Sequence, residues 1–161
     1  MADPLVIIGR SEELELVDQA LVIPAKIDTG AFRSAIHFKS VEVLEQNGNR
    51  VLHAELLGHP SSPKVFTMDF EEYESVGVKN SFGVREVRYK IRLRVKLGTK
   101  VFWTSFTLAD RSNNLMPILV GRELLTDRFI VDVSKTSINR KQLREIYNQN
   151  ASNNSETKRE V

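Results

Sequence analysis

The chain reads Ala25-Lys26-Ile27-Asp28-Thr29-Gly30-Ala31 where an apolar, β-branched run that starts at Leu21 ends. The run predicts a strand that delivers a carboxylate to a tight turn. Gly30 permits a turn or a close backbone approach that a side chain would obstruct, and Thr29 adds a stiff hydroxyl that can donate a hydrogen bond. Asp28 can therefore be a catalytic acid held on rigid backbone, although an acid that only caps a turn has the same local sequence.

A second stretch, Ile118 to Leu125, is another apolar strand that ends in glycine and is followed by a helical pattern. Together the two stretches resemble the retropepsin-like aspartic peptidases, in which a D-T-G-A turn packs beside a later apolar strand ending in glycine. Pro4–Glu12, Ala25–His37 and Phe106–Leu125 are similar to a narrower bacterial and archaeal group of this family, once labelled ATP-dependent zinc proteases. Members of that group are associated with ATP-grasp ligases that add glutamates to proteins.

The resemblance implies an all-β fold, a retropepsin-like closed β barrel or sandwich with one short helix after the Gly121 strand. Many short strands separated by turn signals agree with this fold class. We expect the peptidase domain to span residues 1–147 and to end in a short helix capped by Ser137. Residues 148–161 are polar and bury little apolar surface, so we expect a flexible tail.

The resemblance also implies the roles of the site residues. Asp28, Thr29 and Gly30 would form the catalytic turn, and the residues that follow it would border the substrate: Ala31, Phe32 and Arg33. Structural support for the turn would come from Val120, Gly121 and Arg122. Viral retropepsins often place an Asp after D-T-G-A to pair with the Arg of their G-R, but this chain has Phe32 there, so Arg122 needs another partner.

Aspartic peptidases use two carboxylates that share one proton. This chain contains one D-T-G and no D-S-G, and its other candidate acids lack a following Ser/Thr-Gly: Asp69, Asp110, Asp127 and Asp132. The retropepsin arrangement is a two-fold symmetric dimer in which each chain gives one Asp. The sequence therefore predicts a homodimer that hydrolyses peptide bonds with two copies of Asp28.

The composition is that of one soluble globular domain, with 161 residues, 41% hydrophobic and 27% charged residues, and no cysteine. A net charge of +2 indicates no particular partner. We find no signal-peptide pattern and no apolar run long enough to span a membrane, so we expect a cytoplasmic protein without a membrane partner.

The three histidines, His37, His53 and His59, do not form an H-E-x-x-H pair, and the chain has no phosphate-binding G-x-x-x-x-G-K-[ST] motif. We therefore expect no metal and no cofactor. A zinc site built from His37, His53 and a distant acid is the less favoured alternative, and His37 is interpreted as a strand residue near the cleft.

The stretch from Val87 to Leu97 alternates apolar and basic residues, which predicts an amphipathic strand. It follows the turn-rich stretch Tyr73–Gly83, where retropepsins carry a flap over the active site. The basic face is either a solvated surface or a track for an acidic chain, with Arg92 and Arg94 as candidate substrate-binding residues. No aromatic residues interleave on that face, which argues against nucleic acid as the ligand.

These observations favour an aspartic peptidase acting on an acidic or glutamate-rich peptide. The alternative is a retropepsin-fold binding module without peptidase activity, which would use its basic strand to dock an acidic partner.

Overall fold

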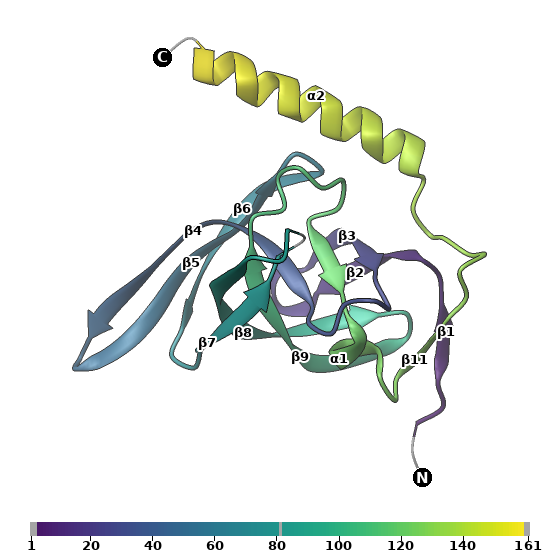
Figure 1. The fold of residues 1–161 in the computed structure, drawn as a ribbon, viewed down its shortest axis with the longest axis horizontal. Coiled ribbons are helices and arrows are strands. Elements are labelled where there is room, and N and C mark those ends of the chain that lie inside the picture. Colours follow the sequence, from purple (N-terminus) through teal and green to yellow (C-terminus); the bar gives the residue numbers. More distant parts are fainter. Residues whose placement is uncertain (1–2, 81, 160–161) are drawn as a thin grey trace.

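Six strands close into a ring in the computed structural model, which describes residues 3–80 and 82–159, with side chains as far as residue 153. Their order is β10-β3-β2-β8-β9-β4, and β4 pairs again with β10 (Figure 1). The all-β, closed fold expected from the sequence is confirmed. The ring strands are β2 (Ser11–Leu16), β3 (Leu21–Ile27), β4 (Ala35–Gln46), β8 (Arg85–Leu97), β9 (Lys100–Ala109) and β10 (Ile118–Val120).

The core lies inside this ring and follows from strand alternation. On β8, the expected apolar face is buried from Ile91 to Leu97, while Arg92 and Lys96 on the other face are exposed. Opposing strands contribute fully buried side chains such as Ile23 and Phe106. The period-two pattern therefore predicted both the strand and its inward face correctly.

A long arm projects from the ring (Figure 1). Strands β4 and β5 (Asn49–His59) form a hairpin whose turn residues Asn47 and Gly48 both have positive φ, 53° and 80°. This is the conformation that an Asn-Gly hairpin turn requires. Strand β6 (Ser62–Phe70) pairs with β5, so most of the loop expected over 58–63 is strand.

The expected flap is a hairpin made by β7 (Glu74–Lys79) and the start of β8. Its turn is fixed by the Asn80 side chain, which accepts hydrogen bonds from the backbone N–H groups of Phe82 and Val84 at 2.9 and 3.1 Å. Residue 81, which falls within the predicted flap, lies outside the described residues.

The remaining elements lie at the chain ends and after β10. Strand β1 (Val6–Ile8) pairs in parallel with β11 (Phe129–Val131), a short 3-10 helix covers Val17–Gln19, and α1 (Arg122–Leu125) follows Gly121 as expected. The second helix, α2, runs for 20 residues from Arg140 to Arg159. Among the described helices, none is both long and apolar enough to cross a membrane.

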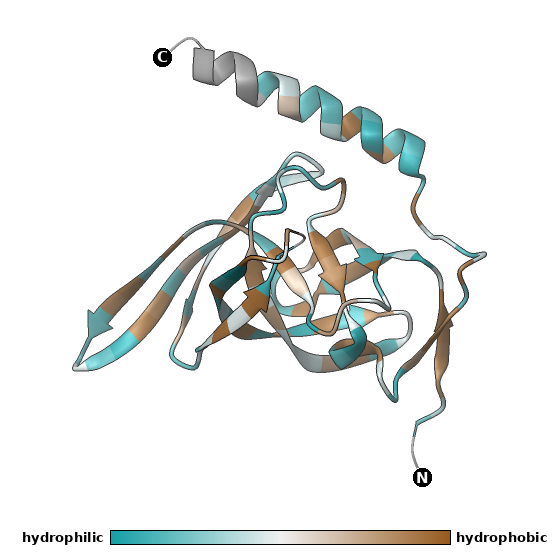
Figure 2. Ribbon diagram, viewed as in Figure 1, coloured by the Kyte–Doolittle hydropathy of each residue, from teal (hydrophilic) through white to brown (hydrophobic). Residues whose placement is uncertain are grey.

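Two expectations about α2 are corrected. Its cap is Asn139, whose Oδ1 accepts from the Gln142 N–H at 3.1 Å, whereas Ser137 donates its hydroxyl to Glu12. The helix also passes residue 147 without a break, although Figure 2 shows it as mostly hydrophilic. A helix satisfies its backbone groups internally, and Asn150 anchors it by donating to the Pro60 carbonyl at 2.7 Å. The flexibility expected of residues 148–161 stays a prediction.

Candidate active site

The Asp28 turn lies where β3 and β10 run in parallel, with Ile27 paired to Val120. The Asp28 N–H donates to the Val120 carbonyl at 2.8 Å, and Asp28 Oδ1 accepts from the Gly30 N–H at 2.9 Å. Thus the capping interaction is present, and it fixes one carboxylate oxygen. The other oxygen, Oδ2, has no hydrogen-bond partner among the described residues and is free to act on a ligand.

The structure places Val120, Gly121 and Arg122 against this turn. A Cβ on Gly121 would lie 2.6 Å from the Arg33 carbonyl oxygen and 2.7 Å from that of Phe32, so only glycine fits. Beside it, the Gly121 N–H donates to the buried Ser34 hydroxyl at 3.0 Å, and the Arg122 N–H donates to the Ala31 carbonyl at 2.8 Å. Gly121 therefore packs directly against the segment that follows Asp28 and supports the turn.

Arg122 finds its partners without the acid that viral retropepsins provide. Its Nη1 donates to the Thr29 carbonyl at 3.1 Å, and its guanidinium carbon lies 5.9 Å from the centre of the Phe32 ring. Arg33 lies at a similar distance from that ring and 3.9 Å from Glu123. Phe32 therefore substitutes a cation–π contact for the missing ion pair, while Thr29 and Gly30 remain exposed.

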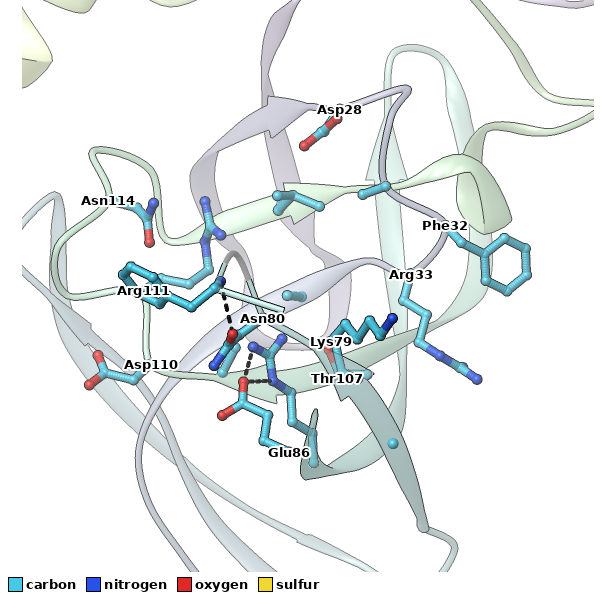
Figure 3. A pocket seen from close by; sticks show the side chains of 18 residues that line it. Asp28, Phe32, Arg33, Lys79, Asn80, Glu86, Thr107, Asp110, Arg111 and Asn114 are labelled. Atoms are coloured by element: carbon cyan, nitrogen blue, oxygen red, sulfur yellow. Dashed lines mark hydrogen bonds and ion pairs between the residues drawn. The ribbon is translucent and has the colours of Figure 1, made fainter. Parts of the chain in front are cut away.

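A cleft of 690 Å³ opens in front of Asp28, between the turn, the flap hairpin and the segment 109–114 (Figure 3). Two other acids line it, Glu86 and Asp110. Glu86 is paired with Arg88, and Asp110 accepts from the Ser112 N–H and points away from Asp28 in Figure 3. Within the described part of the cleft, Asp28 makes no ion pair, and its charge acts on the guanidinium of Arg111.

Arg92 and Arg94 are not brought to this cleft. Arg92 lines a separate hollow with Trp103, and Arg94 pairs with Asp18 at 2.6 Å. Arg88, at the flap end of the same strand, does line the cleft. Six residues of strand span roughly 20 Å, so cations that share one face of β8 cannot all reach one site.

Sequence reasoning missed a buried layer beneath the cleft, built from His37, His59 and Arg111. His59 Nε2 donates to the carbonyls of Arg111 and Asn114 at 2.8 and 2.9 Å, and His37 Nδ1 accepts from the Arg111 N–H at 2.9 Å. The two imidazole rings are 5.1 Å apart. The two histidines hold the loop that carries Arg111. In the sequence, the one signal for this arrangement is that Asp110 and Arg111 directly follow a predicted strand.

The structure does not bring His37 and His53 together in the way the alternative zinc site requires. His53 lies opposite Glu42 on the arm and pairs with Asp69 at 2.6 Å, whereas His37 is in the buried layer. No group of three potential ligands among the described residues is arranged to hold a metal ion.

Acid is expected to destabilise the fold through this layer. Burial lowers the pKa of His37, and lowers the pKa of His59 from 6.5 to about 4. The unfolded chain binds a proton at His59 more tightly than the folded chain does. The contribution of neutral His59 to the free energy of unfolding is therefore complete above pH 6.5, and roughly 2–3 kcal/mol of it is lost as pH falls toward 4. Urea denaturation at about pH 7 and pH 4.5 measures this loss.

The variant His59→Gln is the control, because its amide can donate to the same carbonyls without titrating. We expect a smaller loss of stability in acid for this variant than for the wild type. An identical loss in both proteins would show that His59 does not contribute to the pH dependence.

Comparisons with known proteins identify relatives of this chain. A model of the RimB-like family, described as retropepsin-like aspartic endopeptidase RimB, matches residues 7–142. A solved structure of Lpg0085 from Legionella pneumophila, a protein of unknown function, is 30% identical with a TM-score of 0.62 and covers 81% of this chain and 95% of its own.

Curated relatives include probable alpha-L-glutamate ligases. The protein from Desulfotalea psychrophila is 31% identical over 130 residues, and that from Parasynechococcus marenigrum is 30% identical over 131 residues. These matches cover 78% and 79% of this chain but only 28% of each ligase. The family model covers most of the chain and includes both glycine motifs, so the chain belongs to the RimB-like family of retropepsin-like aspartic endopeptidases.

Proposed function

We propose that the protein is an aspartic peptidase that cleaves acidic, glutamate-rich peptides as a homodimer, with one Asp28 from each chain in the catalytic dyad. The observation that carries this proposal is the Asp28 turn itself. One carboxylate oxygen is fixed by Gly30, the other has no partner among the described residues, and the neighbouring Thr29 and Gly30 are exposed. Such a half-site can be completed by a second copy related by two-fold symmetry.

In the proposed dimer, the two Asp28 carboxylates share one proton, because like charges this close do not both ionise. The ionised member takes a proton from water, which attacks the peptide carbonyl carbon, while the protonated member gives its proton to the carbonyl oxygen. The Gly30 N–H orients the carboxylate through both steps. The apparent pKa values then belong to the pair and not to either residue.

The acidic substrate is supported by the charges of the cleft. Four cations line it, Arg33, Lys79, Arg88 and Arg111, against three acids. Neither Lys79 nor Arg111 pairs with a described acid. The similarity to one part of the probable glutamate ligases supports glutamate as the acidic residue, because a domain joined to such a ligase is well placed to act on its product.

A cleavage assay tests this function. The purified protein is incubated near neutral pH with a glutamate-rich peptide and a matched peptide in which glutamine replaces glutamate, and products are identified by mass. We expect cleavage of the glutamate peptide and much slower cleavage of the glutamine peptide. Tight binding without cleavage would instead support the binding-module alternative, and absence of both would contradict the acidic-substrate proposal.

A further inference from the structure

A second hollow of 360 Å³ adjoins the loop that carries Arg111, as the main cleft also does. Ile27, the residue before Asp28, lines this second hollow, and Arg111 and Asn114 line both. Four cations face it, and no carboxylate does among the residues the structure describes: the cations are Arg10, Lys26, Arg111 and Arg140. We call this space the basic hollow.

Arg111 is the central cation of the basic hollow, because it is only 8% exposed. Its Nε donates to the Met116 carbonyl at 3.0 Å, which fixes the plane of the guanidinium. Its terminal nitrogens have no hydrogen-bond or ion-pair partner in residues 3–80 and 82–153, whose side chains the structure describes. In Figure 3 the guanidinium lies between Asn114 and Asp28.

Desolvation lowers the pKa of Arg111 to about 10, so the side chain is still charged at neutral pH. A buried charge is costly unless an opposite charge and hydrogen bonds compensate it. The structure supplies rigid support from Met116 and His37. The opposing charge that acts on Arg111 is that of Asp28, which forms no ion pair with it. This combination is expected of a ligand-binding cation and not of a structural ion pair.

The other cations of the basic hollow are also available to an anion. The Nη1 of Arg10 donates a hydrogen bond to the Val133 carbonyl at 2.9 Å, and Lys26 is exposed on β3. None of the four pairs with a described acid. Glu12, on the adjacent strand β2, is engaged by the Gly9 N–H at 2.7 Å and by the Ser137 hydroxyl at 2.6 Å.

We propose that Arg111, assisted by Lys26, Arg10 and Arg140, forms a subsite that binds a carboxylate of the peptide substrate beside the bond to be cleaved. This inference rests on the proposed peptidase function of Asp28. A guanidinium fork matches the two oxygens of a carboxylate, and its fixed plane selects their direction. Since Ile27 lines the basic hollow and precedes Asp28, the bound carboxylate belongs to a residue next to the scissile bond or to a chain end there.

Binding is tested in the full-length Asp28→Asn protein, so that hydrolysis does not interfere. Isothermal titration gives the Kd of a short glutamate peptide for this protein and for the same protein carrying Arg111→Met. We expect Arg111→Met to weaken binding about 10- to 100-fold, because a hydrogen-bonded charge pair is lost. The matched control is Arg50→Met, which removes an exposed cation from the arm, and it should change the Kd less than about twofold.

Two modified peptides separate the possible sources of the carboxylate. One carries glutamine in place of a single glutamate, and the other carries a C-terminal amide. If the Kd of one modified peptide no longer changes with Arg111→Met, the group altered in that peptide is the one that Arg111 binds. If Arg111→Met fails to fold, the exposed Lys26→Met carries the test, with an expected loss of about two- to fivefold.

An unchanged Kd in a folded Arg111→Met protein, or in Lys26→Met where it replaces that variant, would overturn the subsite. The subsite would also be overturned if Arg111→Met changed the Kd of all three peptides equally.

Failure of the subsite and failure of the peptidase function give different results. If the wild type binds through Arg111 but cleaves nothing, the peptidase proposal fails, and Arg111 is a carboxylate-binding residue without a cleavage role. If the wild type and Arg111→Met cleave glutamate and glutamine peptides with the same preference, the subsite fails and the peptidase stands.

Discussion

Replacing Asp28 with asparagine is expected to lower the rate of peptide hydrolysis by about a thousandfold or more, because one member of an interdependent catalytic set is lost. The fold should survive, since the asparagine oxygen can still accept from the Gly30 N–H that Asp28 Oδ1 engages at 2.9 Å. The measurements are the cleavage rate of a glutamate-rich peptide and the midpoint of thermal unfolding for both proteins.

The matched control is Asp110→Asn, in the same cleft. Asp110 points away from Asp28, and its contact with the Ser112 N–H is one that asparagine can also make. We expect this variant to keep nearly the wild-type rate. Full activity in Asp28→Asn, once contamination by wild type is excluded, would contradict the aspartic mechanism, and activity lost on chelation but restored by zinc would favour a metal enzyme.

Replacing Gly121 with alanine is expected to have the largest effect on stability. The added Cβ would lie 2.6 Å from the backbone oxygen of Arg33 and 2.7 Å from that of Phe32, and neither can rotate away. Overpacking of this kind costs on the order of 1–3 kcal/mol. Because those carbonyls belong to the segment just after Asp28, we also expect peptidase activity to fall, and urea denaturation with a cleavage assay measures both effects.

Gly77→Ala is the control for this substitution. A Cβ on Gly77 would meet nothing within 4 Å, and its φ is not in the left-handed region. Its free energy of unfolding should stay close to that of the wild type. If Gly121→Ala proved equally harmless, the close packing between the two glycine motifs would not be what holds the catalytic turn.

The parts of the fold that local patterns encode could be predicted from the sequence. Alternation from Val87 to Leu97 predicted β8 and its buried face. The two apolar runs ending in glycine predicted strands, and the family resemblance placed them side by side, as the pairing of Ile27 with Val120 confirms. Strand periodicity and glycine punctuation are local properties, so a single sequence carries them.

The basic hollow and the buried layer could not be predicted in this way. Arg111 lies in a loop without periodicity, and it is held by His37 and His59, which are 74 and 52 residues away in the chain. The exposed stripe on β8 was the more visible pattern, yet Arg94 is neutralised by Asp18 from a distant strand connection. Which cations stay unpaired depends on such long-range contacts, and the periodicity of the sequence does not predict them.

The central claim is that two copies of Asp28 form one catalytic site, and a subunit-mixing experiment tests it most directly. Wild type and Asp28→Asn are mixed at constant total concentration, allowed to exchange subunits, and assayed against the fraction of wild type. The account predicts that activity follows the square of that fraction, because only wild-type pairs carry the complete dyad. Activity that falls linearly with the fraction would contradict it, since each chain would then act alone.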